Sequence, residues 1–423
     1  MNPHRTILAF GRRLVLLGRR PGLQNCGLAL VACTPNLLDP DPEVMLLPPI
    51  VGAPTIQSAC NGPPTAGRRL AITTTDFATG ALTIVDTKTL TSSPDVALGS
   101  TDAKPFAHGD YLYLLHRFQI DALDVIDPNA GWTLVDQQAI ETQGSASANP
   151  QTIAFSSDDR AYIPLFGKPS VLVYDLEDPR HPLADGAFDL RPVADADGNP
   201  EASLALVCDD VLLVSLQFLD PSAGFRPRRD NGEVAIFDRA SGRLYDLDPN
   251  TEGIQGIPLR GSWARQWRLD ARDPSGHSLL VLSEGIERID LDTWTSSWVI
   301  APDVLAELGI SSYLQPQAFA LTAEGQALYL ASYTEDFAEV VVDRFLLGEA
   351  DQTSDPVRVL AGLQTSEQTL EITAGTLWIG DRSPGASGVL GFKLGIDPSA
   401  PLQPLHSEPL TTGLPPYAIT LVP

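Results

Sequence analysis

The stretch NPQTIAFSSDDRAYIPLFGKPSVLVYDL, residues 149–176, holds the pattern that decides the fold. Three short apolar runs alternate with a polar, Asp-containing turn and a turn with Gly and Pro, and the last run closes at Asp175. Runs of this length between turn residues are typical of β-strands rather than helices. The stretch therefore predicts consecutive strands joined by short turns.

An apolar strand that ends in aspartate returns at intervals along the chain after Arg68. Its closing residues are Asp86, Asp127, Asp175, Asp238, Asp290 and Asp343, with Lys393 as a degenerate seventh, and the gaps are 41, 48, 63, 52, 53 and 50 residues. A repeat of this size, built from strands and turns, predicts the blades of a β-propeller, because a single sheet cannot bury both of its faces without neighbours. We expect the six aspartates to be turn residues whose carboxylates accept backbone N–H groups.

The end of the chain predicts how the ring closes. LPPYAITLVP (414–423) repeats the cue of the innermost strands, such as QPQAFAL (315–321), but no partner strand follows it. The first propeller strand, at Leu70, has no such cue before it. We therefore predict an all-β, seven-bladed propeller over 69–423 in which strand 417–422 joins the blade formed by 69–97. Six or eight blades remain alternatives because the region 201–262 is irregular.

Composition limits the partners. The 423 residues carry a formal charge of −25, and residues 1–32 contain five arginines and no acid, which leaves 23 basic against 53 acidic residues in the rest. Such a surface repels nucleic acid and anionic lipid. We expect no nucleic-acid partner, no cofactor and a monomeric chain.

The N-terminal region predicts export. LALVAC, ending at Cys33, resembles the bacterial lipoprotein signal, in which the cysteine is lipidated, although an ordinary cleaved signal is the alternative. We expect a signal over 1–33, a Pro-rich tether over 34–68 and a protein anchored in the bacterial cell envelope through its lipid alone. In that oxidising location Cys60 and Cys208 could form a disulfide, or Cys208 could simply be buried.

The stretch 149–176 resembles the repeat of the YVTN and lactonase-like seven-bladed β-propellers, and the resemblance extends over about 69–423. It implies the fold. It does not imply one function, because such propellers include enzymes, cofactor-bearing subunits and binding platforms.

Two departures from the repeat map to the rim made by loops between the second and third strands of blades and by loops between blades. The first, 217–233, holds Gln217, Arg226, Arg228, Arg229 and Asp230, whose cations suit carboxylate or phosphate groups unless they pair with nearby acids. In the second, 191–203, the oxygen donors Asp195, Asp197 and Asn199 fit either a calcium ion or a plain turn.

Trp263 and Trp267 could line the channel mouth and stack on a sugar, or pack between sheets like Trp294 and Trp298. The six histidines show no metal-ligand spacing, and no nucleophile elbow or phosphate-binding loop is present. The main hypothesis is a non-catalytic platform for a protein, glycan or small molecule. The alternative is a lactonase-like hydrolase with an axial pocket at the rim, and a third possibility is a subunit working with a redox partner.

Overall fold

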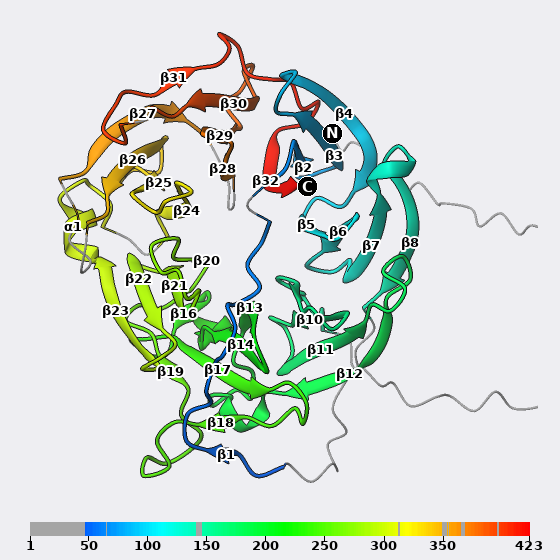
Figure 1. Ribbon diagram of the computed structural model, residues 1–423, viewed down its shortest axis with the longest axis vertical. Helices are drawn as coiled ribbons and strands as arrows, with labels where there is room; N and C mark the ends of the chain where they lie inside the picture. Colours follow the sequence, from blue (N-terminus) through cyan, green and yellow to red (C-terminus); the bar gives the residue numbers. More distant parts are fainter. Residues whose placement is uncertain are drawn as a thin grey trace, which may run out of the picture. The chain divides into compact units, whose positions relative to one another are not determined.

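The computed structural model describes residues 47–423, except 65, 141–145, 312–313, 349–352, 354, 365–368 and 396, all within one compact unit, Asn36–Pro423. Seven four-stranded antiparallel sheets surround a central axis (Figure 1). The predicted seven-bladed β-propeller is confirmed. In the described part of the chain, no helix has the length and apolar character needed to cross a membrane.

The blades are numbered here in chain order, and each is given from its innermost to its outermost strand. Blade 1 is β32 (Pro416–Val422), β2 (Arg69–Thr75), β3 (Gly80–Asp86) and β4 (Thr91–Gly99); blade 2 is β5 (Ala103–His108), β6 (Tyr111–His116), β7 (Ala122–Asp127) and β8 (Thr133–Ala139); blade 3 is β9 (Ala154–Phe155), β10 (Arg160–Pro164), β11 (Ser170–Asp175) and β12 (Leu183–Asp189). Blade 4 is β13 (Ala202–Cys208), β14 (Val211–Leu216), β17 (Glu233–Asp238) and β19 (Ile257–Pro258); blade 5 is β20 (Gln266–Leu269), β21 (Ser278–Leu282), β22 (Ile286–Asp290) and β23 (Thr295–Ile300). Blade 6 is β24 (Pro316–Leu321), β25 (Ala327–Tyr333), β26 (Val340–Leu346) and β27 (Val357–Leu363); blade 7 is β28 (Leu370–Thr373), β29 (Thr376–Asp381), β30 (Gly388–Lys393) and β31 (Gln403–Pro404).

The ring closes through its two ends, as predicted. β32 pairs with β2 along its length, from Arg69 opposite Val422 to Thr74 opposite Pro416. The red C-terminal strand therefore lies inside the blue N-terminal blade (Figure 1). This pairing covers the edge that β2 would otherwise expose.

The core lies between blades rather than within them. Tyr113 and Leu115 of blade 2 pack with Ile163 and Leu165 of blade 3, and similar buried clusters join other neighbouring sheets. The helix α1 (Pro302–Ala306) follows blade 5, and its Leu305 is buried between blades 5 and 6. Burial between sheets explains why the strands are nearly continuous apolar runs.

Five of the six repeated aspartates end their strands and accept turn N–H groups, as expected. Asp86, for example, accepts from Lys88 and Thr89, and Asp290 accepts from Asp292 and Thr293. Asp343 is different, and the prediction for it is wrong. It lies inside β26, is fully buried and pairs with Arg358 of β27, with Nε and Oδ1 3.1 Å apart. β26 continues for three residues beyond it, so no turn N–H is available to its carboxylate.

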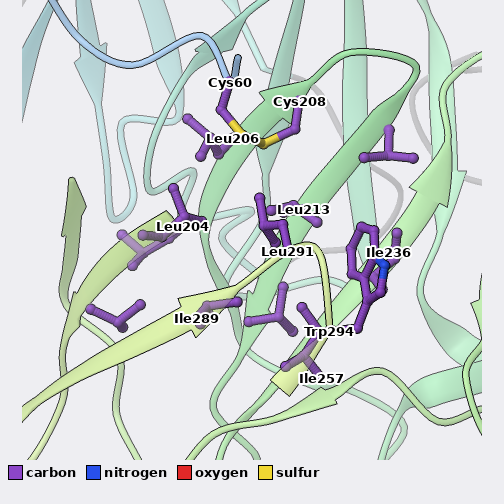
Figure 2. Close-up of a cluster of buried hydrophobic side chains, with 14 of the residues drawn as sticks. Cys60, Leu204, Leu206, Cys208, Leu213, Ile236, Ile257, Ile289, Leu291 and Trp294 are labelled. Carbon is purple, nitrogen blue, oxygen red and sulfur yellow. A yellow bond between two sulfur atoms is a disulfide. The ribbon is translucent and has the colours of Figure 1, made fainter. Parts of the chain in front are cut away.

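The N-terminal segment that we name the strap, residues 47–64, lies against the propeller instead of forming a free tether. β1 (Ile50–Val51) pairs in parallel with β18 (Tyr245–Asp246), an extra strand of the region between β17 and β19. Ile56 is buried, and Cys60 forms a disulfide with Cys208, the last residue of β13. Figure 2 shows this disulfide beside the apolar side chains of blades 4 and 5. The expectation of a tether therefore fails for these residues, because side-chain burial and pairing outweigh the conformational freedom of a Pro-rich linker.

The strap continues across the centre of the ring from blade 4 to blade 1 (Figure 1). The backbone N–H of Asn61 donates to the carbonyl of Val207, at 2.8 Å. At Gly67 the chain approaches blade 1 so closely that a Cβ would lie 2.3 Å from the carbonyl oxygen of Val422. Only glycine fits there.

Candidate functional site

An axial cavity of about 450 Å³ lies among the innermost strands. Its wall combines residues of blades 1, 2, 3, 4, 5 and 7 with Asn61, Gly62, Pro63 and Pro64 of the strap. This volume is in the range of small-molecule sites. Its wall mixes aromatic and aliphatic side chains, such as Phe106, Phe155 and Ile419, with a few polar ones.

An ion pair crosses the wall of this cavity. Nη2 of Arg268 on β20 lies 2.9 Å from Oε2 of Glu371 on β28, and both side chains are mostly buried. Between them passes β24, whose Phe319 carbonyl accepts a hydrogen bond from Nε of Arg268. The pair therefore links blades 5 and 7 through blade 6, and it places a positive and a negative group on one wall.

His108, at the end of β5, lines the same cavity. Its ring stacks on Phe155 with centroids 4.3 Å apart. Burial lowers the pKa of His108, and the charge of Asp159 opposes this shift only in part. The imidazole is therefore neutral near pH 7, which leaves one ring nitrogen able to accept a proton.

The cavity opens toward a different end of the channel from the one that the sequence predicts for an axial pocket. Its wall includes Gly109, Ser156 and Ser157, which lie in turns that follow innermost strands, whereas the rim loops follow the second strands. The strap lies at this same end, beside Cys208. Because neighbouring strands are antiparallel, the two kinds of connection face opposite ends.

At the rim end, polar side chains bond to one another. Nε of Arg117 donates to Oδ1 of Asp102 at 2.8 Å, the Tyr417 hydroxyl donates to the same oxygen at 2.7 Å, and Nη1 of Arg117 donates to Oε1 of Gln151 at 2.9 Å. β32 shifts register next to Tyr417, and β24 does so at Gln317. Such bulges redirect side chains, and the hydroxyl of Tyr417 at the first bulge takes part in this network.

The rim arginines predicted to bind an anion have protein partners instead. Arg228 forms ion pairs with Asp195, Asp197 and Asp220 at 2.9–3.2 Å, and Arg229 lies over the ring of Phe218 at 3.7 Å and near Glu233. Gln217 is buried and its amide donates to Ser203 and to the carbonyl of Ala264. Arg226 is exposed on β16 (Arg226–Pro227), which pairs with β15 (Leu219–Asp220), and Asp230 is also exposed. The alternative of ion pairing therefore accounts for Arg228 and Arg229.

The carboxylates of the suggested calcium loop likewise pair with a positively charged side chain of the protein itself. Arg228 sits against the carboxylates of Asp195 and Asp197, and the side-chain amide of Asn199 donates to the Phe166 carbonyl and to Glu201. Among the described residues, no group of three or more His, Cys, Asp or Glu side chains is arranged to hold a metal ion. This loop serves as a turn that carries an ion-pair network.

Glu201, which the sequence did not single out, is the buried member of this network. Its carboxylate accepts hydrogen bonds from the backbone N–H of Leu219 at 2.7 Å and from Asn199 at 3.1 Å. Burial raises its pKa to about 7, and the charges of Asp197 and Asp195 add to that effect.

The two candidate tryptophans, Trp263 and Trp267, lie in different surroundings. Trp267 of β20 lines the axial cavity and packs on the core of blades 4 and 5, so it fits both interpretations. Trp263 lies in the loop before β20 with the Arg265 guanidinium 5.5 Å from its ring. Trp294 is buried, as the packing alternative expects.

Exposed phenylalanines at the tips of rim loops also escaped the sequence analysis. Phe77, Phe225 and Phe337 have positive φ angles of 65°, 60° and 56°, and 69%, 43% and 46% of their surface is exposed. A left-handed backbone is unfavourable for a bulky residue. The repeated Asp-Phe-Ala at 76–78 and 336–338 was a usable signal, because the aspartates accept the N–H of Ala78 and Ala338 and so fix these turns.

The predicted lipidation site, Cys33, and the whole predicted signal lie outside the described residues.

No family model and no curated protein match the sequence. Solved structures with the same architecture do match the structure of this chain. Two proteins described as a "putative 6-phosphogluconolactonase", from Bacteroides uniformis and Bacteroides fragilis, superpose with TM-scores of 0.58 and 0.57 at 13% and 12% identity. The alignments cover 83% and 84% of this chain and 98% of each of those chains. A periplasmic gluconolactonase from Pseudomonas aeruginosa gives 0.56 at 13% identity, over 84% of this chain and 99% of that one.

This chain shares their fold. At these identities the likeness extends to the architecture alone.

Proposed function

We propose that this protein is an exported hydrolase that opens a lactone, an internal ester, of a sugar acid in the axial cavity. The observation that carries the proposal is that Arg268, Glu371 and His108 line one axial cavity of about 450 Å³ together with aromatic side chains. The similar propellers include proteins described as lactonases, which supports the hydrolase over the non-catalytic platform favoured by the sequence.

Each of the three groups has a role in the proposed reaction. Neutral His108 takes a proton from water as the water oxygen attacks the lactone carbonyl. Arg268, oriented by Glu371, donates to the oxygen that becomes negative in the transition state. The ring C–O bond then breaks, the proton passes to the departing alkoxide, and the product is the open-chain hydroxy acid.

The charge of the cavity favours an uncharged substrate. The guanidinium of Arg268 is paired with the Glu371 carboxylate, so the two charges balance. Its hydrogen bonds to Glu371, Phe319 and Leu370 leave one Nη1 N–H for the substrate oxygen. The chain as a whole is strongly acidic. We therefore expect unphosphorylated gluconolactone to be preferred over 6-phosphogluconolactone.

The test is acid release measured by pH-stat with glucono-1,5-lactone, corrected for spontaneous hydrolysis. His108→Gln is expected to lower kcat/KM by about 10²–10⁴-fold, the usual contribution of a general base. Arg268→Gln is expected to lower it by about 10²–10³-fold, as for loss of one oxyanion donor. Arg180→Gln, an exposed arginine paired with Asp178, is the matched control and should leave the rate unchanged. Turnover that persists in both cavity variants would refute the assignment.

Export and anchoring belong to the same proposal. A disulfide between Cys60 and Cys208 suits an oxidising compartment outside the cytosol. The similar gluconolactonase from Pseudomonas aeruginosa is periplasmic. We propose that Cys33 carries the lipid that holds the protein at the membrane.

A binding platform is the second candidate, and the exposed rim phenylalanines favour it. Three bulky side chains kept in an unfavourable backbone conformation fit contacts with a protein or glycan. The test is a thermal-shift screen with fractions of envelope extract, comparing wild type with Phe77→Ala/Phe225→Ala/Phe337→Ala. Leu98→Ala, at a residue that is 85% exposed on the outer strand β4, is the control. A shift that survives in the triple variant would exclude the rim.

A further inference from the structure

The strap contributes part of the cavity wall although it comes from outside the propeller repeat. Asn61, Gly62, Pro63 and Pro64 line the cavity together with the innermost strands. The side-chain amide of Asn61 is 3.4 Å from the carbonyl of Phe155, so the strap reaches blade 3 as well as blade 4. At Gly62 a Cβ would lie 2.8 Å from a methyl carbon of Leu269, so the strap also touches blade 5.

Several contacts fix the strap before it reaches the cavity. Nε and Nη2 of Arg243 donate to the carbonyls of Pro48 and Pro49 at 2.8 and 3.1 Å, and the N–H of Gln57 donates to Oδ2 of Asp209 at 2.9 Å. The disulfide to Cys208 is the covalent attachment, and it immediately precedes the four wall residues. After them the chain is fixed again where Gly67 meets Val422.

The wall residues therefore form a short bridge with both ends held. Two consecutive prolines lie in it, and proline restricts the backbone. A bridge of this kind keeps a defined width between itself and the turns of blades 2 and 3, at Gly109 and Ser157, which border the same cavity.

We propose that the strap, held by the Cys60–Cys208 disulfide, is a specificity element that limits the size of the molecules admitted to the axial cavity. Removing the disulfide leaves this end of the bridge held by hydrogen bonds alone, such as the one from Asn61 to Val207, and lets the entrance widen. This inference deepens the proposed function, since it concerns the same cavity, but its test requires no turnover.

The test measures access with thiol reagents of two sizes. Thr420, on the cavity wall in β32, is changed to cysteine in a full-length chain in which Cys26 and Cys33 are serine. The reporter is compared with and without Cys60→Ser/Cys208→Ser, using a small and a bulky methanethiosulfonate. We expect the bulky reagent to react about tenfold faster or more without the disulfide, while the small one changes little, because labelling follows the open population. Thr293→Cys, on an exposed turn of blade 5, is the control and should be insensitive to both changes.

A second variant covers the case in which loss of the disulfide disturbs folding. Pro63→Gly/Pro64→Gly keeps the disulfide but loosens the bridge, and it should also accelerate the bulky reagent selectively. Equal acceleration of both reagents, or none, in variants whose circular dichroism is native would overturn the inference. If size selection is found but no lactone is hydrolysed, the strap assignment stands and the proposed reaction fails.

Discussion

Glu201 shows how a single buried carboxylate links stability to pH. Its Oε2 accepts from a backbone N–H, yet Asp195, Asp197 and Asp220 gather around the neighbouring Arg228, so negative charge exceeds positive charge locally. Burial dominates and raises the pKa of Glu201 to about 7. A carboxyl group with a raised pKa favours the folded state when protonated.

This gives a prediction with a definite sign. The stabilisation from protonated Glu201 is fully present below the ordinary pKa of 4.5 and is lost as the pH rises to about 7. The Glu201→Gln variant has no carboxyl group at this position, so it should not lose this stabilisation as the pH rises. The urea midpoint of the variant should therefore increase relative to that of the wild type between pH 4.5 and 7. Glu252→Gln, at an exposed position, is the control. Parallel pH curves for Glu201→Gln and wild type would contradict the assignment.

Among the elements, the strap departs most from what its sequence indicates. Pro and small residues predict a flexible linker, and the local pattern carries no sign of the pairing between β1 and β18. The strands of the blades, in contrast, could be predicted from the sequence. They are buried between sheets, and this burial requires the apolar runs that identify them. Asp343 has the same local sequence as the turn aspartates and differs only because β26 extends further.

The charged and titratable residues of the cavity escaped prediction for a related reason. Arg268 and Glu371 are 103 residues apart and lie on innermost strands of blades 5 and 7, and His108 comes from blade 2. Their proximity depends on how the blades surround the axis, which no local motif encodes. The rim loops stood out in the sequence because they break the repeat, but a broken repeat indicates an insertion rather than a site.

The attachment of the strap should also be measurable as stability. The disulfide joins residues 148 positions apart, so it restricts a long loop of the unfolded chain. Cys60→Ser/Cys208→Ser is expected to lower the free energy of unfolding by about 2–5 kcal/mol, measured by denaturation in guanidinium chloride. Asp209→Ala, which removes only the hydrogen bond from Gln57, should cost far less. Similar losses in the two variants would show that the disulfide adds little beyond the neighbouring contacts.

For the whole molecule, closure of the ring by β32 predicts that removing this strand abolishes cooperative folding. Removing residues 416–423 deletes β32, which leaves the edge of β2 unpaired and exposes Leu70 and Ile72 of the buried cluster. We expect the truncated chain to lose cooperative thermal unfolding and to aggregate, as monitored by calorimetry and gel filtration. Replacing Pro423 alone is the control, since it lies beyond β32. A truncated chain with native melting behaviour would argue against closure as a source of stability.

The proposed anchor also concerns the whole molecule. Cys33→Ala should move the protein from the membrane pellet to the soluble fraction, because the acyl chains supply the membrane affinity. Cys26→Ala is the matched control. Unchanged partitioning of Cys33→Ala would refute lipidation at this residue.

The seam between β2 and β32 has a consequence for biosynthesis. β2 is translated before the other six blades and β32 after them, so blade 1 waits for its inner strand until the rest of the ring has been made. Every nascent chain that lacks β32 shares this defect, whatever the state of its other six blades. Commitment to the native ring is therefore postponed until the last strand of the propeller has been synthesised, a delay that would suit the export proposed above.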